Sequence, residues 1–394
     1  MERDMHKRLL FVDDEPVLRE LYLSLGQNLG YGHEVHAAAS GLEALKLLSQ
    51  SSFDVIVSDL AMPGMDGIEF LNEAAQDFPE SARIVVSGFA DRLKIAECLT
   101  IGHRFFSKPL NFKTLAALLK RICGYSYLVS DERVRRMVCG NGALPTPPET
   151  YFRLNETLNS PYSDLEEVGK IVEQDAGLST KLLHIVNSAQ FGISRQIVTP
   201  TEAVQILGLD VLKALMLGVK AFSFYDENPF IRTTFTDLWS HSLKIAVGSR
   251  KLAALEKLST EACEECFLAG LLHDIGKLIL AANAEKQYQL VLDLSKKAAL
   301  PLHQAEVGIF GCTHAQIGAY LLALWGVPDS VIRAIEHHHS LDHAKITEFN
   351  PLLAVHLTQN LQSGRKKQLD MPLLRQLGLE NRVPEWEHAL SVEN

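Results

Sequence analysis

The sequence predicts a parallel α/β domain followed by an all-α domain, and two patterns predict this order. In the first third of the chain, short apolar runs end in charged or polar residues, as buried parallel strands do. After Pro148, apolar residues recur at three- and four-residue spacing almost to the end of the chain. The 394 residues, 47% of them hydrophobic, suffice for two or three domains with cores of their own.

Four apolar runs predict the strands of the first domain, and functional residues stand where the runs end. The runs cover residues 8–12, 53–58, 82–86 and 104–107, and they are followed by Asp13 and Asp14, Asp59, Ser87 and Lys108. Because open α/β sheets bind ligands at the carboxyl ends of their strands, we expect these side chains to converge. Three carboxylates suit Mg²⁺, and a hydroxyl and an ammonium opposite the metal would hold the oxygens of an acyl phosphate.

These residues, in this order, give residues 6–123 a resemblance to a response-regulator receiver domain. The loop Met62–Gly67 also matches the family's loop after the phosphoacceptor. The resemblance implies a flavodoxin-like (βα)5 fold, phosphorylation of Asp59, and a sensor histidine kinase as phosphodonor. It further implies that Mg²⁺ binds to Asp13, Asp14 and Asp59, and that the switch consists of Ser87, Phe105 and Lys108.

Composition argues against a DNA-binding output. The net charge is −10, and residues 1–123 carry 13 basic and 17 acidic residues, which leaves 25 and 31 for the rest. Neither part offers the basic face that neutralises DNA phosphates. No apolar stretch approaches the length needed to span a bilayer, and the first residues do not form a signal peptide. We therefore expect a cytoplasmic protein that binds neither DNA nor membrane.

The six cysteines are scattered, without the density of a secreted disulfide scaffold, so we expect them to be reduced. Cys263 and Cys266 have CxxC spacing, which on a helix puts two thiols on neighbouring turns of one face. The pair could bind a metal or take part in redox chemistry, or it could simply pack in the helix core. We favour packing, because the chain has no second CxxC pair.

Residues 124–143 are predicted to form a linker that is partly helical. Gly124 follows a helix expected over 112–122, and the charged stretch 130–136 is able to form a short helix. Beyond the linker, Pro and Gly divide residues 144–365 into about a dozen helices of ordinary length. A helical extension is expected over residues 366–394.

Three short motifs, at 144–148, 187–192 and 203–209, contain no obvious reacting group. Their order and spacing resemble the HDOD family, the HD-related output domain of bacterial signalling proteins, over about residues 144–365. The resemblance implies an all-helical, HD-like fold for this part of the chain.

Nine of the fifteen histidines lie between positions 241 and 356. Imidazoles and a carboxylate delivered by several helices suit a divalent transition metal. The pattern resembles the metal site of HD phosphohydrolases, which bind one or two metals that activate water. The resemblance implies as ligands His241, His273, Asp274, His314, His338 and His339. His337 is expected to point away, because consecutive helical residues diverge by about 100°.

The sequence departs from the HD pattern at the last acidic ligand. Residues 349–369 contain no Asp or Glu, and Gln359 or a neighbour stands where the ligand should be. The Gly-Tyr-Pro segment of cyclic di-GMP phosphodiesterases is also missing. Two divalent metals carry about four positive charges, and a single Asp provides too little negative charge to offset them.

Other residues near the predicted site are weighed separately. A single-metal site of His241, His273, Asp274 and His314 is feasible on ligand types, and Lys277 is a candidate phosphate contact. For His356 we weigh a ligand against a core residue and favour the core residue. We expect His303 and His343 on solvated loops.

Two functions from different classes follow. We favour a response regulator whose phosphorylation controls a non-enzymatic HDOD domain that binds signalling partners. The alternative is a receiver-gated, metal-dependent phosphohydrolase, for example of cyclic dinucleotides. A weaker third hypothesis is binding to a cyclic-dinucleotide signalling enzyme or a sensor kinase. The sequence leaves open the cognate kinase, the output partner, the direction of the response, and whether the chain is a monomer or a homodimer.

Overall fold

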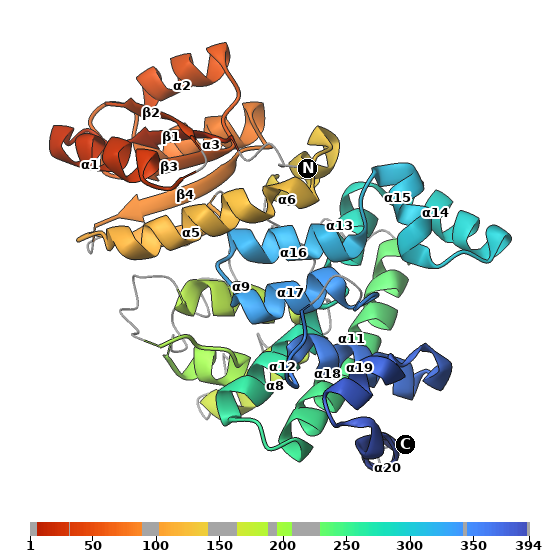
Figure 1. The fold of residues 1–394 in the computed structure, drawn as a ribbon. Helices are drawn as coiled ribbons and strands as arrows, with labels where there is room; N and C mark the ends of the chain where they lie inside the picture. The colour runs from red at the N-terminus through yellow and green to blue at the C-terminus, as the bar shows by residue number, and fades with distance from the viewer. Residues whose placement is uncertain are drawn as a thin grey trace.

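A computed structural model describes residues 6–30, 32–88, 102–140, 164–187, 195–206, 229–341 and 345–391. The motif at 144–148, most of the motif at 187–192, residues 207–209 and His343 lie outside the described residues. The chain forms an α/β domain that rests on a larger helical region, with α5 and α6 between the two (Figure 1).

The first domain is built on a parallel sheet of five strands in the order β2-β1-β3-β4-β5. The strands are β1 Arg8–Val12, β2 Glu34–Ala38, β3 Val55–Asp59, β4 Ala82–Ser87 and β5 Arg104–Ser107. The predicted α/β class is confirmed. The apolar runs identified every strand except β2, an edge strand with mixed residues. The strand order reverses between β1 and β3, so the crevice lies at the carboxyl ends of these two strands.

Helices cover both faces of the sheet, because successive strand residues alternate between the faces. Leu9 and Phe11 face α1 and α5, whereas Leu10 and Val12 face α2 and α3. Asp66 begins α3 with a capping box, in which its side chain accepts from the backbone and Glu69 reaches back to the Asp66 amide. The helices are α1 Pro16–Gln27, α2 Gly41–Gln50, α3 Gly67–Asp77 and α5 Phe112–Tyr125.

The connection between the domains begins later than predicted. Helix α5 does not stop at Ile122 but continues through Gly124 to Tyr125. Tyr125 packs half-buried against the apolar core, and this contact offsets the weak helix propensity of glycine, about 1 kcal/mol. A short 3₁₀ helix, η1 Ser126–Leu128, and helix α6 Glu132–Cys139 follow. The charged stretch is thus a docked helix, with Val134 and Val138 buried.

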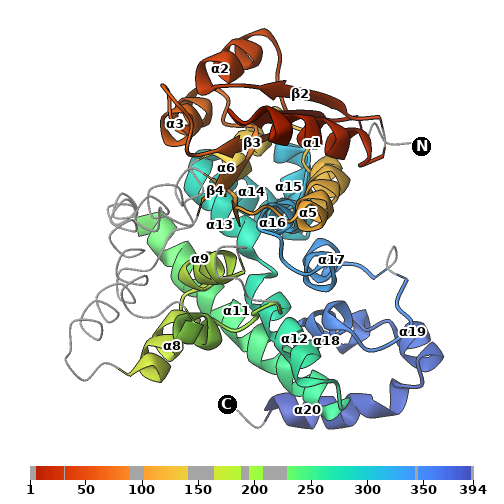
Figure 2. The same ribbon diagram turned by 90° about the vertical axis from the view of Figure 1, so that its left-hand side faces the viewer.

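The described residues from 164 onward form helices joined by turns, so the predicted all-α domain is confirmed (Figures 1 and 2). Its helices are α8 Leu165–Glu173, α9 Ala176–Val186, α11 Pro229–Leu255, α12 Thr260–Leu272, α13 Ile275–Asn283, α14 Glu285–Ala298, α15 Leu302–Phe310, α16 His314–Leu324, α17 Asp329–His337, α18 Pro351–Gln362, α19 Met371–Gln376 and α20 Val383–Ser391.

Helix α16 lies at the centre of the molecule. All its residues except Gln316 are buried. It packs against α5 and α6 on one side and against α13 and α17 on others. Apolar side chains of the sheet, α5, α6 and the helical domain form one continuous core cluster. The two domains are therefore held together by shared packing as well as by the connecting chain.

The C-terminal segment completes the helical domain. Trp386 of α20 is fully buried, and its indole Nε1 donates to Glu256 Oε1 at 2.8 Å. Arg382 Nε donates to the same oxygen at 2.9 Å. These contacts fix α20 against the segment that follows α11.

Among the described helices, no single one is long and apolar enough to cross a membrane. The pair α15 and α16 meets the length and composition criteria only together, and it is bent by 74°.

Candidate phosphorylation site and histidine cluster

The carboxyl ends of β1 and β3 and the residue after β5 form an acidic pocket. Asp13 is fully buried and Asp59 is 3% exposed. Lys108 Nζ lies 2.7 Å from Asp59 Oδ2 and 3.2 Å from Asp13 Oδ2. One carboxylate oxygen from each of Asp13, Asp14 and Asp59 falls within 4.8 Å of the others. This all-oxygen donor set fits Mg²⁺.

The electrostatics of the pocket reflect several acids around one cation. Burial raises the pKa of Asp13, although the Glu15 amide and Lys108 oppose this shift. Burial alone would lower the pKa of Lys108, but its contacts with Asp59 and Asp13 raise it well above its usual range. Glu15 was not singled out from the sequence; its Oε1 lies 3.2 Å from Lys108 Nζ. The only available signal was its position directly after the aspartate pair.

The predicted switch residues lie on the last two strands. Ser87 ends β4, is buried, and donates from Oγ to the Gly88 carbonyl at 3.2 Å. It pairs in register with Ser107 of β5, next to Lys108. The backbone of Phe105 belongs to β5, but its side chain lies outside the described part of the structure.

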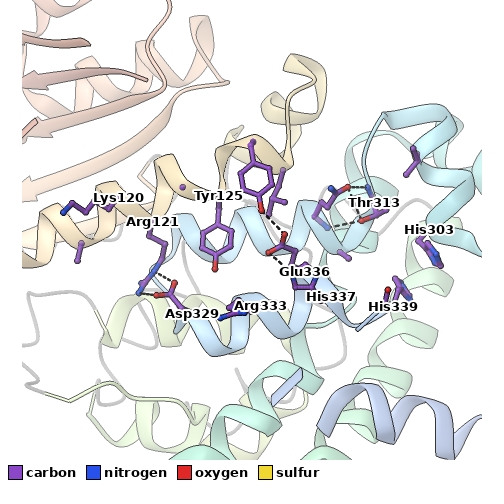
Figure 3. Close-up of a pocket in the computed structure, with 18 residues that line it drawn as sticks. Lys120, Arg121, Tyr125, His303, Thr313, Asp329, Arg333, Glu336, His337 and His339 are labelled. Carbon is purple, nitrogen blue, oxygen red and sulfur yellow. Dashed lines mark hydrogen bonds and ion pairs between the residues drawn. The ribbon is translucent and has the colours of Figure 1, made fainter. Parts of the chain in front are cut away.

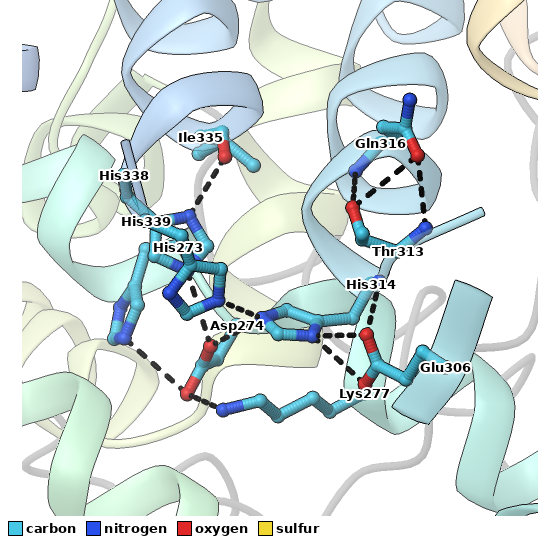
Figure 4. Close-up of polar contacts among 10 residues, drawn as sticks. All are labelled: His273, Asp274, Lys277, Glu306, Thr313, His314, Gln316, Ile335, His338 and His339. Atoms are coloured by element: carbon cyan, nitrogen blue, oxygen red, sulfur yellow. Dashed lines mark hydrogen bonds and ion pairs between the residues drawn. The ribbon is translucent and has the colours of Figure 1, made fainter. Parts of the chain in front are cut away.

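The predicted HD-type residues come together between helices of the second domain (Figure 4). His241 comes from α11, His273 and Asp274 from the junction of α12 and α13, and His314 from the first turn of α16. His338 and His339 follow α17. Their donor atoms form two groups, each within 4.8 Å: His241, His273 and Asp274, and His314, His338 and His339.

Asp274 is the centre of this histidine cluster. Its Oδ2 lies 3.3 Å from His273 Nε2, and its Oδ1 lies 3.2 Å from His314 Nε2 and 3.7 Å from His338 Nε2. His339 Nε2 lies 2.9 Å from His314 Nε2. His273, His314 and His338 are fully buried.

Two charged residues complete the cluster. Lys277, a candidate phosphate contact, donates instead to Asp274 Oδ2 at 2.6 Å. Glu306 of α15, which the sequence did not reveal, is fully buried and accepts from His314 Nδ1 at 2.7 Å and from its amide at 2.8 Å. Burial alone would lower the pKa of His314, but the charge of Glu306 raises it. The Nδ1 contact leaves His314 Nε2 facing the cluster.

The cluster has a donor set that fits a divalent transition metal. His273 Nε2, His338 Nε2 and Asp274 Oδ1 are buried and make no hydrogen bond. Burial, together with the neighbouring His273, lowers the pKa of His241 to about 4. Burial also lowers the pKa of His338 well below its usual value. Neutral imidazoles with free Nε2 atoms are suitable ligands for such a metal.

The remaining histidines lie around this centre. His303 was expected on a solvated loop, but it lies on α15, where stacking on His339, with ring centroids 4.4 Å apart, draws it to the cluster. His337 Nε2 faces Glu336 at 3.6 Å. His356 of α18 is buried, with Nδ1 3.1 Å from the His338 carbonyl oxygen. Gln359 follows one turn later on α18 and is half-buried.

The CxxC pair lies on α12, where Cys263 and Cys266 are buried against Ala253 and Ala354. Burial raises the pKa of both thiols. This environment is that of packed core cysteines.

A cleft of about 1170 Å³ runs between the two domains and reaches the edge of the cluster (Figure 3). Its walls come from α5 and η1 on one side and α17 on the other, with residues of α16 between them. Arg121 pairs with Asp329 across it, Nε to Oδ1 at 2.9 Å, and Tyr127 donates to Glu336 at 3.1 Å. His303 and His339 line its far end.

Comparison with known proteins matches both parts of the chain. The response regulator receiver domain model matches residues 9–120, and the HDOD domain model matches residues 144–341. Chemotaxis protein CheY-3 of Vibrio cholerae is 32% identical over 127 residues, which are 31% of this chain and 97% of CheY-3. An uncharacterized protein of Treponema pallidum is 27% identical over 214 residues, 54% of this chain.

Several relatives are longer than the matched region. The match spans 40% of the Treponema protein and 12% of the sensor kinase CckA of Brucella abortus, which is 36% identical over 118 residues. Among solved structures, the MmoQ response regulator of Methylococcus capsulatus is 23% identical, with a TM-score of 0.49 over 64% of this chain and 98% of MmoQ.

A parallel sheet with an acidic pocket, followed by an all-helical domain, defines a two-component response regulator. The histidine cluster lies in the helical domain that follows the receiver. The chain belongs to the HDOD family, with the HDOD domain following an N-terminal receiver.

Proposed function

We propose that phosphorylation of Asp59 controls an HDOD domain that acts by binding a signalling partner, without catalysis. A sensor histidine kinase is the proposed phosphodonor. The likeness of the receiver to the sensor kinase CckA and to sporulation initiation phosphotransferase F of Bacillus subtilis supports a phosphorelay. In the receiver, Asp13, Asp14 and Asp59 would hold Mg²⁺, which neutralises the incoming phosphate.

The observation that carries the non-enzymatic output is the closed state of the histidine cluster. Asp274 is 2% exposed, and His273, His314 and His338 are fully buried, so a phosphoester would contact them only if the surrounding helices moved apart. Asp274 is already paired with Lys277, and Glu306 with His314. The cluster therefore has little free negative charge to hold two metals.

Phosphorylation-dependent partner binding is tested with purified full-length protein as bait. Wild type treated with Mg²⁺ and beryllofluoride, untreated wild type and Asp59→Ala are compared for the proteins they retain from a lysate. We expect one partner whose retention differs between treated and untreated wild type and does not respond in Asp59→Ala. Identical retention in all three would contradict control of the output by Asp59.

Catalysis is tested in parallel. With Mn²⁺, Fe²⁺ or Ni²⁺ added, we expect no hydrolysis of cyclic di-GMP or of bis(p-nitrophenyl) phosphate, with and without beryllofluoride. Turnover that disappears in Asp274→Ala would overturn the non-enzymatic proposal.

A metal-dependent phosphohydrolase is the second candidate. It is favoured by His273 Nε2, His338 Nε2 and Asp274 Oδ1, which are buried and make no hydrogen bond. A metal held by these atoms would supply an activated water. Metal content separates the candidates: close to two ions per chain favours catalysis, whereas none or one favours binding only. Gln359→Asp tests whether a restored carboxylate on α18 produces hydrolysis.

A further inference from the structure

Arg104 is a buried cation that joins the two domains. It lies on β5 of the receiver and is 9% exposed. Its Nη1 donates to the Trp325 carbonyl at 2.9 Å, and its Nη2 donates to the Asn187 carbonyl. Among the described residues it forms no ion pair with a carboxylate. Two backbone oxygens of the HDOD domain thus accept from its guanidinium.

Both carbonyls lie at helix C-termini, where a cation is favourable because the last carbonyls lack partners and the dipole is negative. Trp325 follows α16, and Asn187 follows α9. Gly326, with φ +72°, ends the α16 turn; a Cβ there would lie 3.3 Å from Arg104 Cζ. Asn187 is fixed in turn, because its side chain exchanges two hydrogen bonds with the Ile197 backbone, at 2.7 and 2.8 Å.

The other end of β5 reaches the phosphorylation site. Lys108 directly follows the strand, four positions after Arg104, and its Nζ contacts Asp59. A phosphoryl group on Asp59 would offer Lys108 a new partner, and β5 is the short strand that joins Lys108 to Arg104.

The other end of α16 reaches the histidine cluster. The helix has 11 residues, about 16 Å, and begins with His314. Because nearly every side chain on it is buried, a displacement at Trp325 would move the helix as a unit and so shift His314 against Asp274 and His339.

We propose that Arg104 couples the phosphorylation state of Asp59 to the histidine cluster, with α16 as the moving element. The inference rests on the proposed function only in requiring that Asp59 takes a phosphoryl group. Linkage is reciprocal, so a divalent ion in the cluster would change the affinity of the receiver for beryllofluoride by the same factor.

The solvent-exposed contacts between the domains are poorer candidates for this coupling. Arg121 pairs with Asp329, whose side chain is 60% exposed, and water and salt screen such a pair. Arg121 therefore provides a matched control: it is an arginine that crosses the same interface, but it pairs with the side chain of Asp329 of α17 (Figure 3).

The experiment compares wild type, Arg104→Met, Arg104→Lys and Arg121→Met as full chains. Hydrogen exchange of amides 314–325 is measured with and without beryllofluoride in excess Mg²⁺. In the same samples, Co²⁺ is titrated into the cluster and followed by its visible absorption. We expect beryllofluoride to change α16 exchange and Co²⁺ affinity by about fivefold or more in wild type and Arg121→Met. Less than a twofold change is expected in Arg104→Met.

Arg104→Lys covers the case in which Arg104→Met does not fold. A lysine keeps the charge but donates from a single atom, so it should reach one carbonyl and give an intermediate response. An equal response in wild type and both Arg104 variants would overturn the inference, as would a wild type whose α16 exchange ignores bound beryllofluoride. If beryllofluoride does not slow hydrogen exchange around Asp59, both this inference and the proposed function fail. Exchange in α16 requires no metal, so absent Co²⁺ binding overturns only the metal site.

Discussion

The acidic pocket and the histidine cluster each contain a lysine that forms an ion pair with an aspartate, but the residues around the two pairs differ. Lys108 lies 2.7 Å from Asp59, and Lys277 lies 2.6 Å from Asp274. Lys108 also faces Asp13 and Glu15, so the pocket carries more negative than positive groups. In the cluster, Asp274 and Glu306 are matched by Lys277 and by His314. The pocket therefore has acids left over for a further cation, whereas each of these two acids of the cluster already has a basic partner.

Exposure follows the same division. In the pocket, Lys108 is 21% exposed and Glu15 60%, whereas Lys277 of the cluster is 14% exposed. The centre of the cluster is buried, so it can respond mainly through the packing of the helices that hold it. In the proposed function, the receiver carries the reversible chemistry, and the cluster holds a structural state that the receiver biases.

The largest expected effect is loss of phosphorylation in Asp59→Asn. Asparagine keeps the shape of Asp59 but lacks the carboxylate that attacks the donor and binds Mg²⁺. With acetyl phosphate and Mg²⁺, intact-mass spectrometry should show the added phosphoryl group in wild type and none in Asp59→Asn.

Asp77→Asn is the matched control, because Asp77 is exposed at the end of α3, away from the strand ends. It should be modified like wild type. Modification of Asp59→Asn, or modification of wild type without Mg²⁺, would show that the acidic pocket is not a Mg²⁺-dependent phosphorylation site.

A smaller but still large effect is expected from Glu306→Ala. The change leaves His314 Nδ1 and its amide buried without an acceptor and removes the charge opposite His314. Breaking such a buried pair from one side typically lowers the free energy of unfolding by about 3–5 kcal/mol. Urea unfolding measures this loss. Glu306→Gln keeps an acceptor oxygen and should lose less; equal stability of all three proteins would contradict a structural role for the pair.

The sequence predicted the acidic pocket well because its residues stand at strand ends, and a parallel sheet brings strand ends together. It also predicted the gathering of His241, His273 and Asp274, since the resemblance fixes their order. It did not predict Glu306, because that residue meets His314 only when the turn at Gly311 folds α15 back onto α16. No periodic pattern contains such a contact.

Contacts between residues far apart in the sequence could not be predicted either. Arg104 was predicted only as the first residue of a strand, yet its partner Trp325 is 221 positions away. His303 and Gly124 were assigned to a loop and a linker from local composition, and tertiary contacts overrode both assignments. His303 stacks on His339, and the packing of Tyr125 extends α5 past Gly124.

A moderate effect is expected from Lys277→Met. Removing the ammonium frees Asp274 Oδ2 and deletes a positive charge from the cluster, so Co²⁺ should bind about tenfold more tightly, equivalent to about 1.4 kcal/mol. Absorption titration in excess Mg²⁺ measures this affinity. Lys296→Met, on the last turn of α14, is the control for an ordinary surface lysine. Unchanged or weaker Co²⁺ binding in Lys277→Met would show that Lys277 does not compete with the metal.

The smallest effect is expected from Glu15→Gln, the receiver counterpart of Glu306→Gln. Both changes remove one negative charge beside a basic side chain, but the Glu15 side chain is 60% exposed, whereas Glu306 is fully buried. Lys108 keeps Asp59 and Asp13 as partners, and solvent screens the lost pair, so the free energy of unfolding should change by less than about 0.5 kcal/mol. Urea unfolding of the two glutamine variants side by side makes the comparison direct. A loss for Glu15→Gln as large as that for Glu306→Gln would mean that burial does not distinguish the two sites.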